Sequence, residues 1–186
     1  MNAPRHLTQA ELEAGLDHIR QAPAAAGQLE LIVRRPAVDA REVLAAGELD
    51  ERAGLVGDTW SARPSARTAD GGPHPEMQLT LMNARVIALL AQTREHWALA
   101  GDQLFVDLDL STANLPAGTR LRIGQAVVEV TAEPHTGCAK FSARFGREAL
   151  IFVNGPAGKA LRLRGLNARI VQSGRIAAGD AVIKLA

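Results

Sequence analysis

The sequence predicts a mainly β protein that folds as one barrel-like domain with a few short helices on its outside. Short apolar segments recur at close spacing with Gly, Pro or Asp turns between them, and few gaps are long enough for a crossover helix. The 186 residues fit one domain. Hydrophobic residues make up 47% of the chain and aromatic residues only 3%, so the core must consist mainly of Leu, Val, Ile and Ala.

The N-terminal segment has the pattern of a short helix. Thr8 and Glu11 stand at the spacing of a capping box, and apolar residues follow at helical intervals. The predicted helix ends before Pro23, which cannot continue it. We therefore expect residues 1–27 to form a helical extension and residues 28–186 to form the barrel domain.

The remaining elements follow from apolar alternation and from turn residues. Two segments between Arg120 and Thr131, joined at Gly124 and Gln125, have the pattern of a β-hairpin. Residues 40–49 fit a helix or a strand equally well. The other strands are expected at 29–35, 55–58, 79–82, 104–110, 167–172 and 180–184, and helices are expected after Asn83 and over 147–153.

Residues 61–75 predict a long loop, because they are rich in Pro, Gly, Ser and Arg. A long loop inside a compact domain is often a binding loop. We expect this loop to be more mobile than the strands and to border the functional site. A solvated excursion without function is the alternative.

Composition excludes several classes of function. The net charge of +1 argues against a general nucleic-acid binder, which would need a strong basic excess. No apolar segment approaches the length that spans a bilayer, and the N-terminus has no apolar signal region. A single cysteine fits a reducing compartment. We expect a soluble cytoplasmic protein with neither a nucleic-acid nor a membrane partner.

Cys138, the only cysteine, is the first candidate for chemistry. Gly137 allows the backbone to approach a ligand closely, and His135 and Lys140 supply positive potential that favours a thiolate. The alternative is a buried cysteine that acts as a small apolar filler. His135 is a candidate acid or base beside the thiol, or else a simple turn histidine.

A series of ordered blocks resembles the MOSC domain family, named after the C-terminal domain of molybdenum-cofactor sulfurases. The resemblance covers roughly residues 28 to 186. Its blocks are 54–58, 78–81, 101–104, 115–124, 127–131, 137–138, 163–171, 174 and 179–180. The sequence departs from the family pattern at two places. Many members have a Pro shortly before the cysteine, where this sequence has His135 to Gly137. Many members also have an Arg at the position of Met77.

The resemblance implies a β-barrel, a bound molybdenum cofactor and a functional role for Cys138. In that family the cysteine is proposed to bind the metal or to carry sulfur as a persulfide, and thiolates suit both roles. Three alternatives stay open: a molybdenum-cofactor enzyme that reduces N-hydroxylated compounds, a sulfur carrier, and a non-catalytic barrel that binds a pterin or other small anion. The first needs a redox partner and the second a separate cysteine desulfurase. Pyridoxal phosphate is a family association only, because it belongs to a desulfurase domain for which this sequence has no room.

Basic residues are the candidates for the phosphate of that cofactor. Lys140, Arg162, Arg164 and Arg169 are expected to bind it, with Arg162 and Arg164 on one face of a strand. A solvated sheet face would explain these residues equally well. Asp58, Asp102 and Asp180 each follow a Gly and are interpreted as turn residues.

Overall fold

The computed structural model describes residues 4–186, and residues 1–3 of the expected N-terminal extension lie outside the described residues. Its strands are β1 (Ala26–Arg34), β2 (Glu42–Leu44), β3 (Ala46–Asp50), β4 (Gly54–Leu55), β5 (Leu79–Asn83), β6 (Leu104–Asp107), β7 (Arg120–Ile123), β8 (Ala126–Val130), β9 (Leu166–Gln172), β10 (Gly174–Ala177) and β11 (Ala181–Lys184). The α-helices are α1 (Gln9–Ala14), α2 (Leu16–Arg20), α3 (Ala84–Ala91), α4 (Ala139–Phe145), α5 (Arg147–Asn154) and α6 (Pro156–Ala160). Three 3₁₀ helices are η1 (Thr59–Ala62), η2 (Pro75–Met77) and η3 (Arg94–Ala100).

Seven strands close into a barrel in the order β1-β11-β7-β8-β9-β5-β6, and β6 pairs again with β1. The closing pair is β1 with β11, in which Ala26 lies opposite Ile183. Every neighbouring pair is antiparallel except β5 with β6. The short strand β2 continues the sheet along β1, and β10, β3 and β4 form a separate small sheet. The mainly β barrel expected from the sequence is confirmed.

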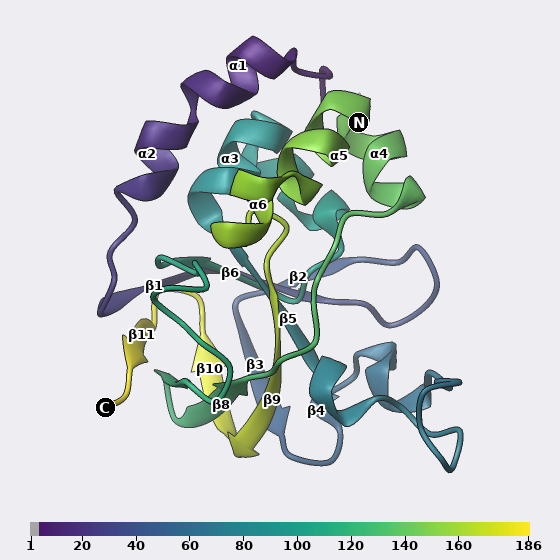
Figure 1. Ribbon diagram of the computed structural model, residues 1–186. Helices are drawn as coiled ribbons and strands as arrows, with labels where there is room; N and C mark the ends of the chain where they lie inside the picture. The colour runs from purple at the N-terminus through teal and green to yellow at the C-terminus, as the bar shows by residue number, and fades with distance from the viewer. Residues whose placement is uncertain (1–3) are drawn as a thin grey trace.

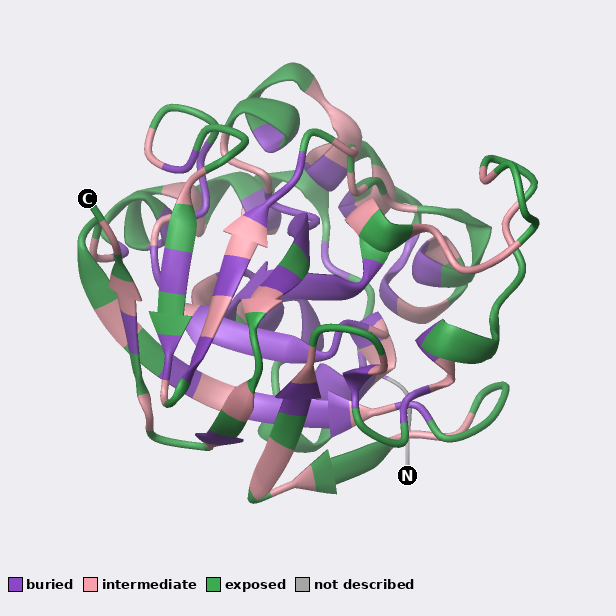
Figure 2. Cartoon of the chain, turned by 90° about the horizontal axis from the view of Figure 1, so that it is seen from below, coloured by how far each residue is buried: buried purple, intermediate pink, exposed green. Residues whose placement is uncertain are grey.

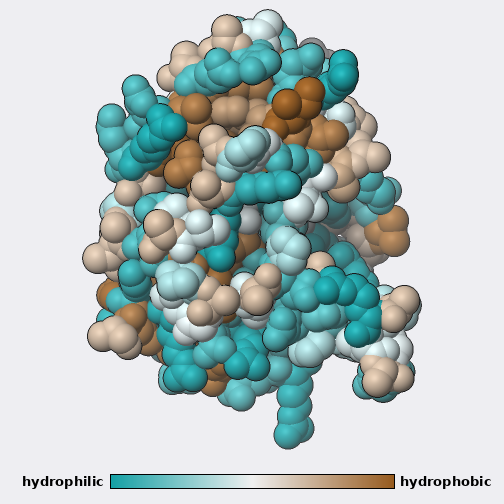
Figure 3. Space-filling view, in the orientation of Figure 1, coloured by the Kyte–Doolittle hydropathy of each residue, from teal (hydrophilic) through white to brown (hydrophobic). Residues whose placement is uncertain are grey.

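Two hydrophobic cores lie on opposite sides of the barrel wall. The inner core is aliphatic and includes Leu29, Leu81 and Val128, as the low aromatic content predicts. The outer core packs the helices against the barrel and contains Phe105 and Phe145. Figure 1 shows the helices gathered at one end of the strands, and Figure 2 shows buried and exposed residues alternating along several strands. On the face shown in Figure 3, apolar side chains gather mainly over the helices.

Local signals in the sequence explain several element boundaries. Thr8 Oγ1 accepts a hydrogen bond from the Glu11 amide, and the Glu11 carboxylate accepts one from the Thr8 amide, which completes the predicted capping box. Asn83 Oδ1 accepts hydrogen bonds from the first amides of α3. The ambiguous segment 40–49 forms strands, because β2 pairs with β1 and β3 pairs with β10.

Other elements differ from the sequence expectation. Helices α4 and α6 and strand β10 were not anticipated. Arg162 and Arg164 lie in a turn after α6 and not on a strand, and Arg162 has a left-handed backbone with φ of 47°. Their side chains therefore do not share a sheet face. Arg162 donates to the Leu115 carbonyl, and Arg164 reaches Asp102 instead.

The predicted loop 61–75 runs from the end of η1 to the start of η2 and projects from the body of the molecule at the lower right of Figure 1. Trp60 Nε1, just before the loop, donates to the His74 carbonyl at 3.2 Å. The Ser65 amide hydrogen-bonds to the Gly72 carbonyl at 3.1 Å. The two ends of the loop are therefore held together, and most residues between them are exposed.

Candidate functional site

Cys138 lines a pocket of about 500 Å³ that is surrounded by basic side chains. We call it the Cys138 pocket. Its walls come from the β1–β2 connection, from η1, from the turn after η3 and from the start of α4. The basic residues that line it are Arg35, Arg41, Arg63, Lys140, Arg144 and Arg164. Among the described lining residues, Asp39 is the one carboxylate.

The Cys138 thiol is exposed and stands immediately before α4. Its pKa is lowered, chiefly by the backbone amide of Phe141 and also by that of Lys140, and partial burial opposes the shift. Arg164 and Arg144 add positive potential that lowers the pKa further. Cys138 is therefore not a buried filler, and an exposed thiol with a lowered pKa has the properties of a nucleophile and of a soft metal ligand.

Asp102 lies beneath the pocket and holds two of its side chains at once. Its carboxylate is fully buried. One oxygen lies 2.7 Å from His135 Nε2, and the other accepts from Arg164 at 2.5 Å. These two partners lower the pKa of Asp102 to about 2, against the opposing effect of burial. Asp102 is thus an ionised anchor, and its interpretation as a turn residue missed this role.

A second buried ion pair positions Arg35. Asp58 accepts two hydrogen bonds from the Arg35 guanidinium, each 2.8 Å long, and Arg35 also donates to the Gly101 carbonyl. Burial raises the pKa of Asp58, but the bonds from Arg35 outweigh that effect, so the pKa is lowered overall. Asp58 also caps η1 by accepting from the Trp60 amide. The same carboxylate therefore fixes both a basic side chain and the start of the loop.

Arg41 and Arg63 form no ion pair with any carboxylate among residues 4–186. Burial and the neighbouring guanidinium groups of Arg144 and Arg35 lower the pKa of Arg41, and burial and Arg35 lower the pKa of Arg63. Burial is the larger cause of both shifts, and neighbouring positive charge adds to it. Arg41 Nε and Arg164 Nε are enclosed and have no hydrogen-bond partner among residues 4–186. An anion in the pocket would offset the positive charge of these side chains.

Asp39 is the counter-charge at the mouth of the pocket. Its carboxylate lies 3.6 Å from Lys140 Nζ and 3.5 Å from Arg144. Asp39 is largely exposed and has a left-handed backbone with φ of 60°. Exposed pairs of this length contribute at most about 1 kcal/mol. With the buried Asp58 and Asp102, three carboxylates pair with the six basic residues of the pocket, and a net positive charge remains.

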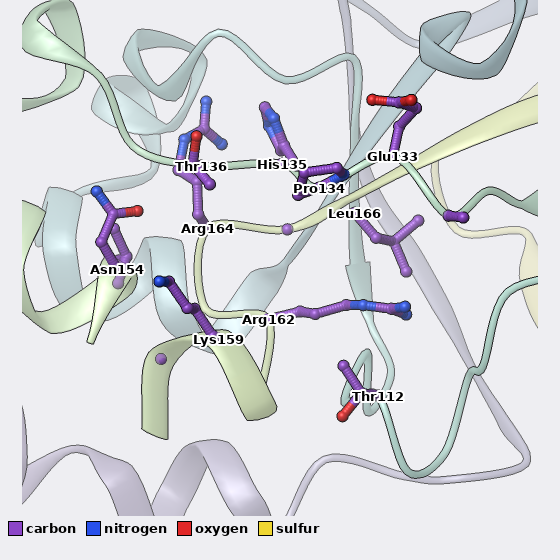
Figure 4. A pocket seen from close by; sticks show the side chains of 14 residues that line it. Thr112, Glu133, Pro134, His135, Thr136, Asn154, Lys159, Arg162, Arg164 and Leu166 are labelled. Atoms are coloured by element: carbon purple, nitrogen blue, oxygen red, sulfur yellow. The ribbon is translucent and has the colours of Figure 1, made fainter. Parts of the chain in front are cut away.

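A smaller pocket of about 260 Å³ adjoins the Cys138 pocket. His135 and Arg164 line both pockets. We call the smaller one the Lys159 pocket. Figure 4 shows Lys159 and Arg162 on one side of it and the segment from Glu133 to Thr136 on the other. The two pockets therefore meet at the segment that leads to Cys138.

The structure divides the residues predicted for the site into three groups. Cys138, His135, Lys140 and Arg164 come together in the Cys138 pocket. Arg162 lines the Lys159 pocket. Arg169 lines neither pocket, and its guanidinium pairs with Glu129 at 2.6 Å on the exposed side of β9.

Sequence reasoning missed the basic residues contributed by the first half of the chain and by the body of α4. Arg35 and Arg41 lie in the β1–β2 connection, Arg63 follows η1, and Arg144 lies in the last turn of α4. No spacing rule links positions that far apart. The available signal was indirect: Gly57–Asp58 and Gly101–Asp102 are Gly-Asp pairs beside short apolar strands, and both aspartates anchor arginines of the pocket.

Two further observations limit the chemistry that is available to the described residues. No group of three or more His, Cys, Asp or Glu side chains in residues 4–186 is arranged to share a metal ion. No helix within that range is both long and apolar enough to cross a membrane. A metal at Cys138 would therefore need ligands that a cofactor brings with it.

Comparison with known proteins gives one family and a set of structural neighbours. The family model described as "MOSC domain" matches residues 36–183. The crystal structure of the YuaD protein from Bacillus subtilis is similar at a TM-score of 0.60 and 16% identity, over 84% of this chain and 94% of that one. YiiM from Escherichia coli is similar at a TM-score of 0.54 and 19% identity, over 86% and 70% of the two chains. YiiM from Geobacillus stearothermophilus gives a TM-score of 0.52 and 14% identity, over 88% and 74%. A search of curated proteins finds no match.

Proposed function

Because this chain belongs to the MOSC domain family, we propose that the Cys138 pocket binds the molybdenum cofactor and that Cys138 is the reactive residue toward it. The observation that carries the proposal is the position of an exposed thiol in a pocket lined by six basic residues. The cofactor carries a phosphate and a metal with sulfur ligands. An excess of positive charge suits the phosphate, and a thiolate suits such a metal.

The residues of the pocket fit such an anionic group. Arg41 Nε and Arg164 Nε are enclosed donors without partners among the described residues. Arg41 and Arg63 have pKa values lowered by burial and by neighbouring positive charge. Arg41, Arg63 and Lys140 are the side chains that would hold the phosphate. Arg35 and Arg164 are already fixed by buried carboxylates, which largely neutralise them, and they would form a rigid part of the pocket wall.

Cys138 would then act in one of two ways. The bound cofactor would supply redox chemistry at its metal, with the Cys138 thiolate as a ligand. Alternatively, Cys138 would receive a sulfur atom from a separate cysteine desulfurase and carry it as a persulfide. Reduction of N-hydroxylated compounds belongs to the first case and needs an external redox partner. In both cases the amides at the start of α4 and the nearby arginines favour the anionic sulfur.

The proposal is tested by cofactor analysis of protein purified from a host that makes the molybdenum cofactor. We expect molybdenum and pterin in the wild type, and both largely retained in Cys138→Ser but without metal-centred or persulfide chemistry. Arg63→Ala should lose roughly tenfold of both, as expected for one lost charged hydrogen bond. Arg169→Ala is the matched control, because Arg169 pairs with Glu129 outside the pocket. A mass increment of one sulfur atom on Cys138 would identify the carrier role.

Two results would overturn the proposal. One is wild-type protein that holds neither molybdenum nor pterin and no added sulfur. The other is loss of cofactor from Arg169→Ala with full retention in Arg63→Ala. Metal-centred chemistry that is unchanged in Cys138→Ser would remove Cys138 as the reactive residue, and cofactor binding without such chemistry or added sulfur in the wild type would favour a non-catalytic binding module.

A further inference from the structure

His135 is built into the wall between the two pockets and is oriented by a buried carboxylate. Its Nε2 lies 2.7 Å from Asp102, and the second oxygen of Asp102 is bound to Arg164. The backbone of Gly165 packs against the ring, since a Cβ at Gly165 would lie 3.2 Å from His135 Cδ2. The imidazole is thus held at one nitrogen and along one edge.

The protonation of His135 follows from its partner. Asp102 is ionised, with a pKa lowered to about 2, and therefore accepts a hydrogen bond and cannot donate one. His135 Nε2 must be the donor. Burial lowers the pKa of His135 more than Asp102 raises it, and the positive charges of Arg164 and Arg35 lower it further. The ring is therefore neutral at pH 7, and a neutral ring protonated at Nε2 has an unprotonated Nδ1.

Nδ1 is the open end of this arrangement. It forms no hydrogen bond to any of residues 4–186, and it is not among the enclosed atoms that lack a partner. About 15% of the His135 side chain is exposed, and His135 lines both the Cys138 pocket and the Lys159 pocket. An unprotonated nitrogen with no partner is therefore accessible from the cavity system that contains the reactive thiol.

We propose that His135 Nδ1 is the proton acceptor of this site and that Asp102 is the positioning residue that holds it in this role. The inference deepens the proposed function and rests on it for the identity of the reacting ligand. The ligand class is a small molecule with a dissociable proton on oxygen, nitrogen or sulfur. Its X–H bond breaks, the electron pair stays on X, and the proton passes to Nδ1. The resulting imidazolium is stabilised by Asp102, and the anion by Arg164 and the neighbouring basic residues.

Asp102 links this proton acceptor to the anion site. The same carboxylate neutralises Arg164 and orients His135, so both side chains depend on one group. Transfer of a proton to His135 adds a positive charge beside Arg164 as the ligand becomes negative. The buried carboxylate of Asp102 offsets the repulsion between the two cations, His135 and Arg164.

The test is the tautomer of His135 in ¹⁵N-labelled protein without cofactor, read from long-range ¹H–¹⁵N correlation spectra. The His135 signals are those missing from His135→Gln, and the other four histidines serve as internal controls. At pH 7 we expect a neutral ring with protonated Nε2 and unprotonated Nδ1. In Asp102→Asn the amide can donate as well as accept, so we expect the Nδ1–H tautomer to become populated. Asp102→Glu should retain the wild-type tautomer.

A protonated Nδ1 in the wild type at pH 7, as imidazolium or as the other tautomer, would overturn the assignment of His135 as proton acceptor. An unchanged tautomer in Asp102→Asn would overturn the role of Asp102. If Asp102→Asn does not fold, Asp102→Glu tests the role of Asp102 instead. Loss of the Nε2–H tautomer in Asp102→Glu would overturn that role, and retention of this tautomer would support it. These spectra need no bound cofactor, so a failure here is distinguishable from a failure of the cofactor analysis.

Discussion

Buried carboxylates organise this site at the scale of single residues. Asp58 and Asp102 are inaccessible, and each binds one arginine that lines the Cys138 pocket. A buried charge is costly unless it is paired and hydrogen-bonded, and both aspartates meet that condition. Removal of either partner would leave an uncompensated charge and cost about 3–5 kcal/mol. The basic surface of the pocket therefore depends on residues that no ligand touches.

The first prediction concerns the reactivity of Cys138. Its pKa is lowered from the ordinary value of 9.0 for a thiol, so the thiolate fraction at pH 7 is larger than that of an ordinary cysteine. The rate of alkylation by iodoacetamide should rise with pH and reach half of its maximum below pH 9.0. Arg144→Ala should move that midpoint upward, because it removes positive potential from the thiolate.

Alkylation is followed by mass spectrometry of the native protein, with the urea-unfolded protein as the reference thiol. Arg169→Ala is again the control that should leave the midpoint unchanged. Labelling that occurs only after unfolding would contradict an accessible thiol. A native midpoint at or above that of the unfolded protein would contradict the lowered pKa.

The sequence predicted Cys138, His135, Lys140 and Arg164 as residues of one site, and the structure brings these four together. Three of them are close in sequence, and Arg164 was expected for the cofactor's phosphate together with Arg162 and Arg169, which lie outside this pocket. The role of Asp102 was not predictable from Gly101–Asp102 alone, because the same pair is typical of a simple turn. Only the three-dimensional position of His135 and Arg164 distinguishes an anchor from a turn residue.

At the scale of elements, the loop 61–75 contributes to the site through its beginning and not through its tip. Arg63 lines the Cys138 pocket, whereas residues 66–71 are mostly exposed and line neither pocket. The expectation that this loop borders the site therefore holds for the end adjoining η1. The tip makes one ion pair with the rest of the chain, from Arg67 to Glu133 at 2.7 Å.

The second prediction separates these two parts of the loop. Replacing residues 66–71 by two glycines should leave the urea unfolding midpoint and the cofactor content nearly unchanged, because loop tips tolerate change and the Trp60–His74 contact is kept. Arg63→Ala should lower the cofactor content roughly tenfold while the unfolding midpoint stays the same. Loss of cofactor from the tip deletion, with retention in Arg63→Ala, would show that the tip is the binding part.

Element prediction succeeded where a local signal was complete. The Asn83 cap and the hairpin of β7 and β8 each depend on residues within a few positions. Helix α4 was missed because its seven residues carry only two large apolar side chains, Phe141 and Phe145, that pack into the outer core. Strand β10 was missed because its partner is β3, more than a hundred residues earlier in the chain. Tertiary pairing decides such elements, and a local pattern does not contain it.

At the scale of the whole molecule, stability depends on the closure of the barrel by β1 and β11. Val182 in β11 is completely buried in the inner core, whereas its neighbour Ala181 is exposed. β11 also pairs with β7, where Val182 lies opposite Ile123. One short strand therefore satisfies the backbone of two neighbours and seals the aliphatic core.

The third prediction tests this closure with two substitutions on the same strand. Val182→Asp should lower the free energy of unfolding by about 3 kcal/mol or more, because it buries a charge without a partner. Ala181→Asp should change it by less than about 0.5 kcal/mol, as is usual for surface positions. Urea unfolding measures both values. Equal costs for the two variants would contradict the burial pattern of β11.

The pairing of β1 with β11 also sets the order of events as the chain is made. A ribosome delivers β1 early and β11 late, so the seam of the barrel stays open while every other strand is produced. Contacts between such distant segments raise contact order and slow folding. Until β11 arrives, β1 and β7 present unpaired edges that other chains could join. The nascent protein is therefore most vulnerable to aggregation before β11 emerges, and chaperone demand should be greatest in that interval.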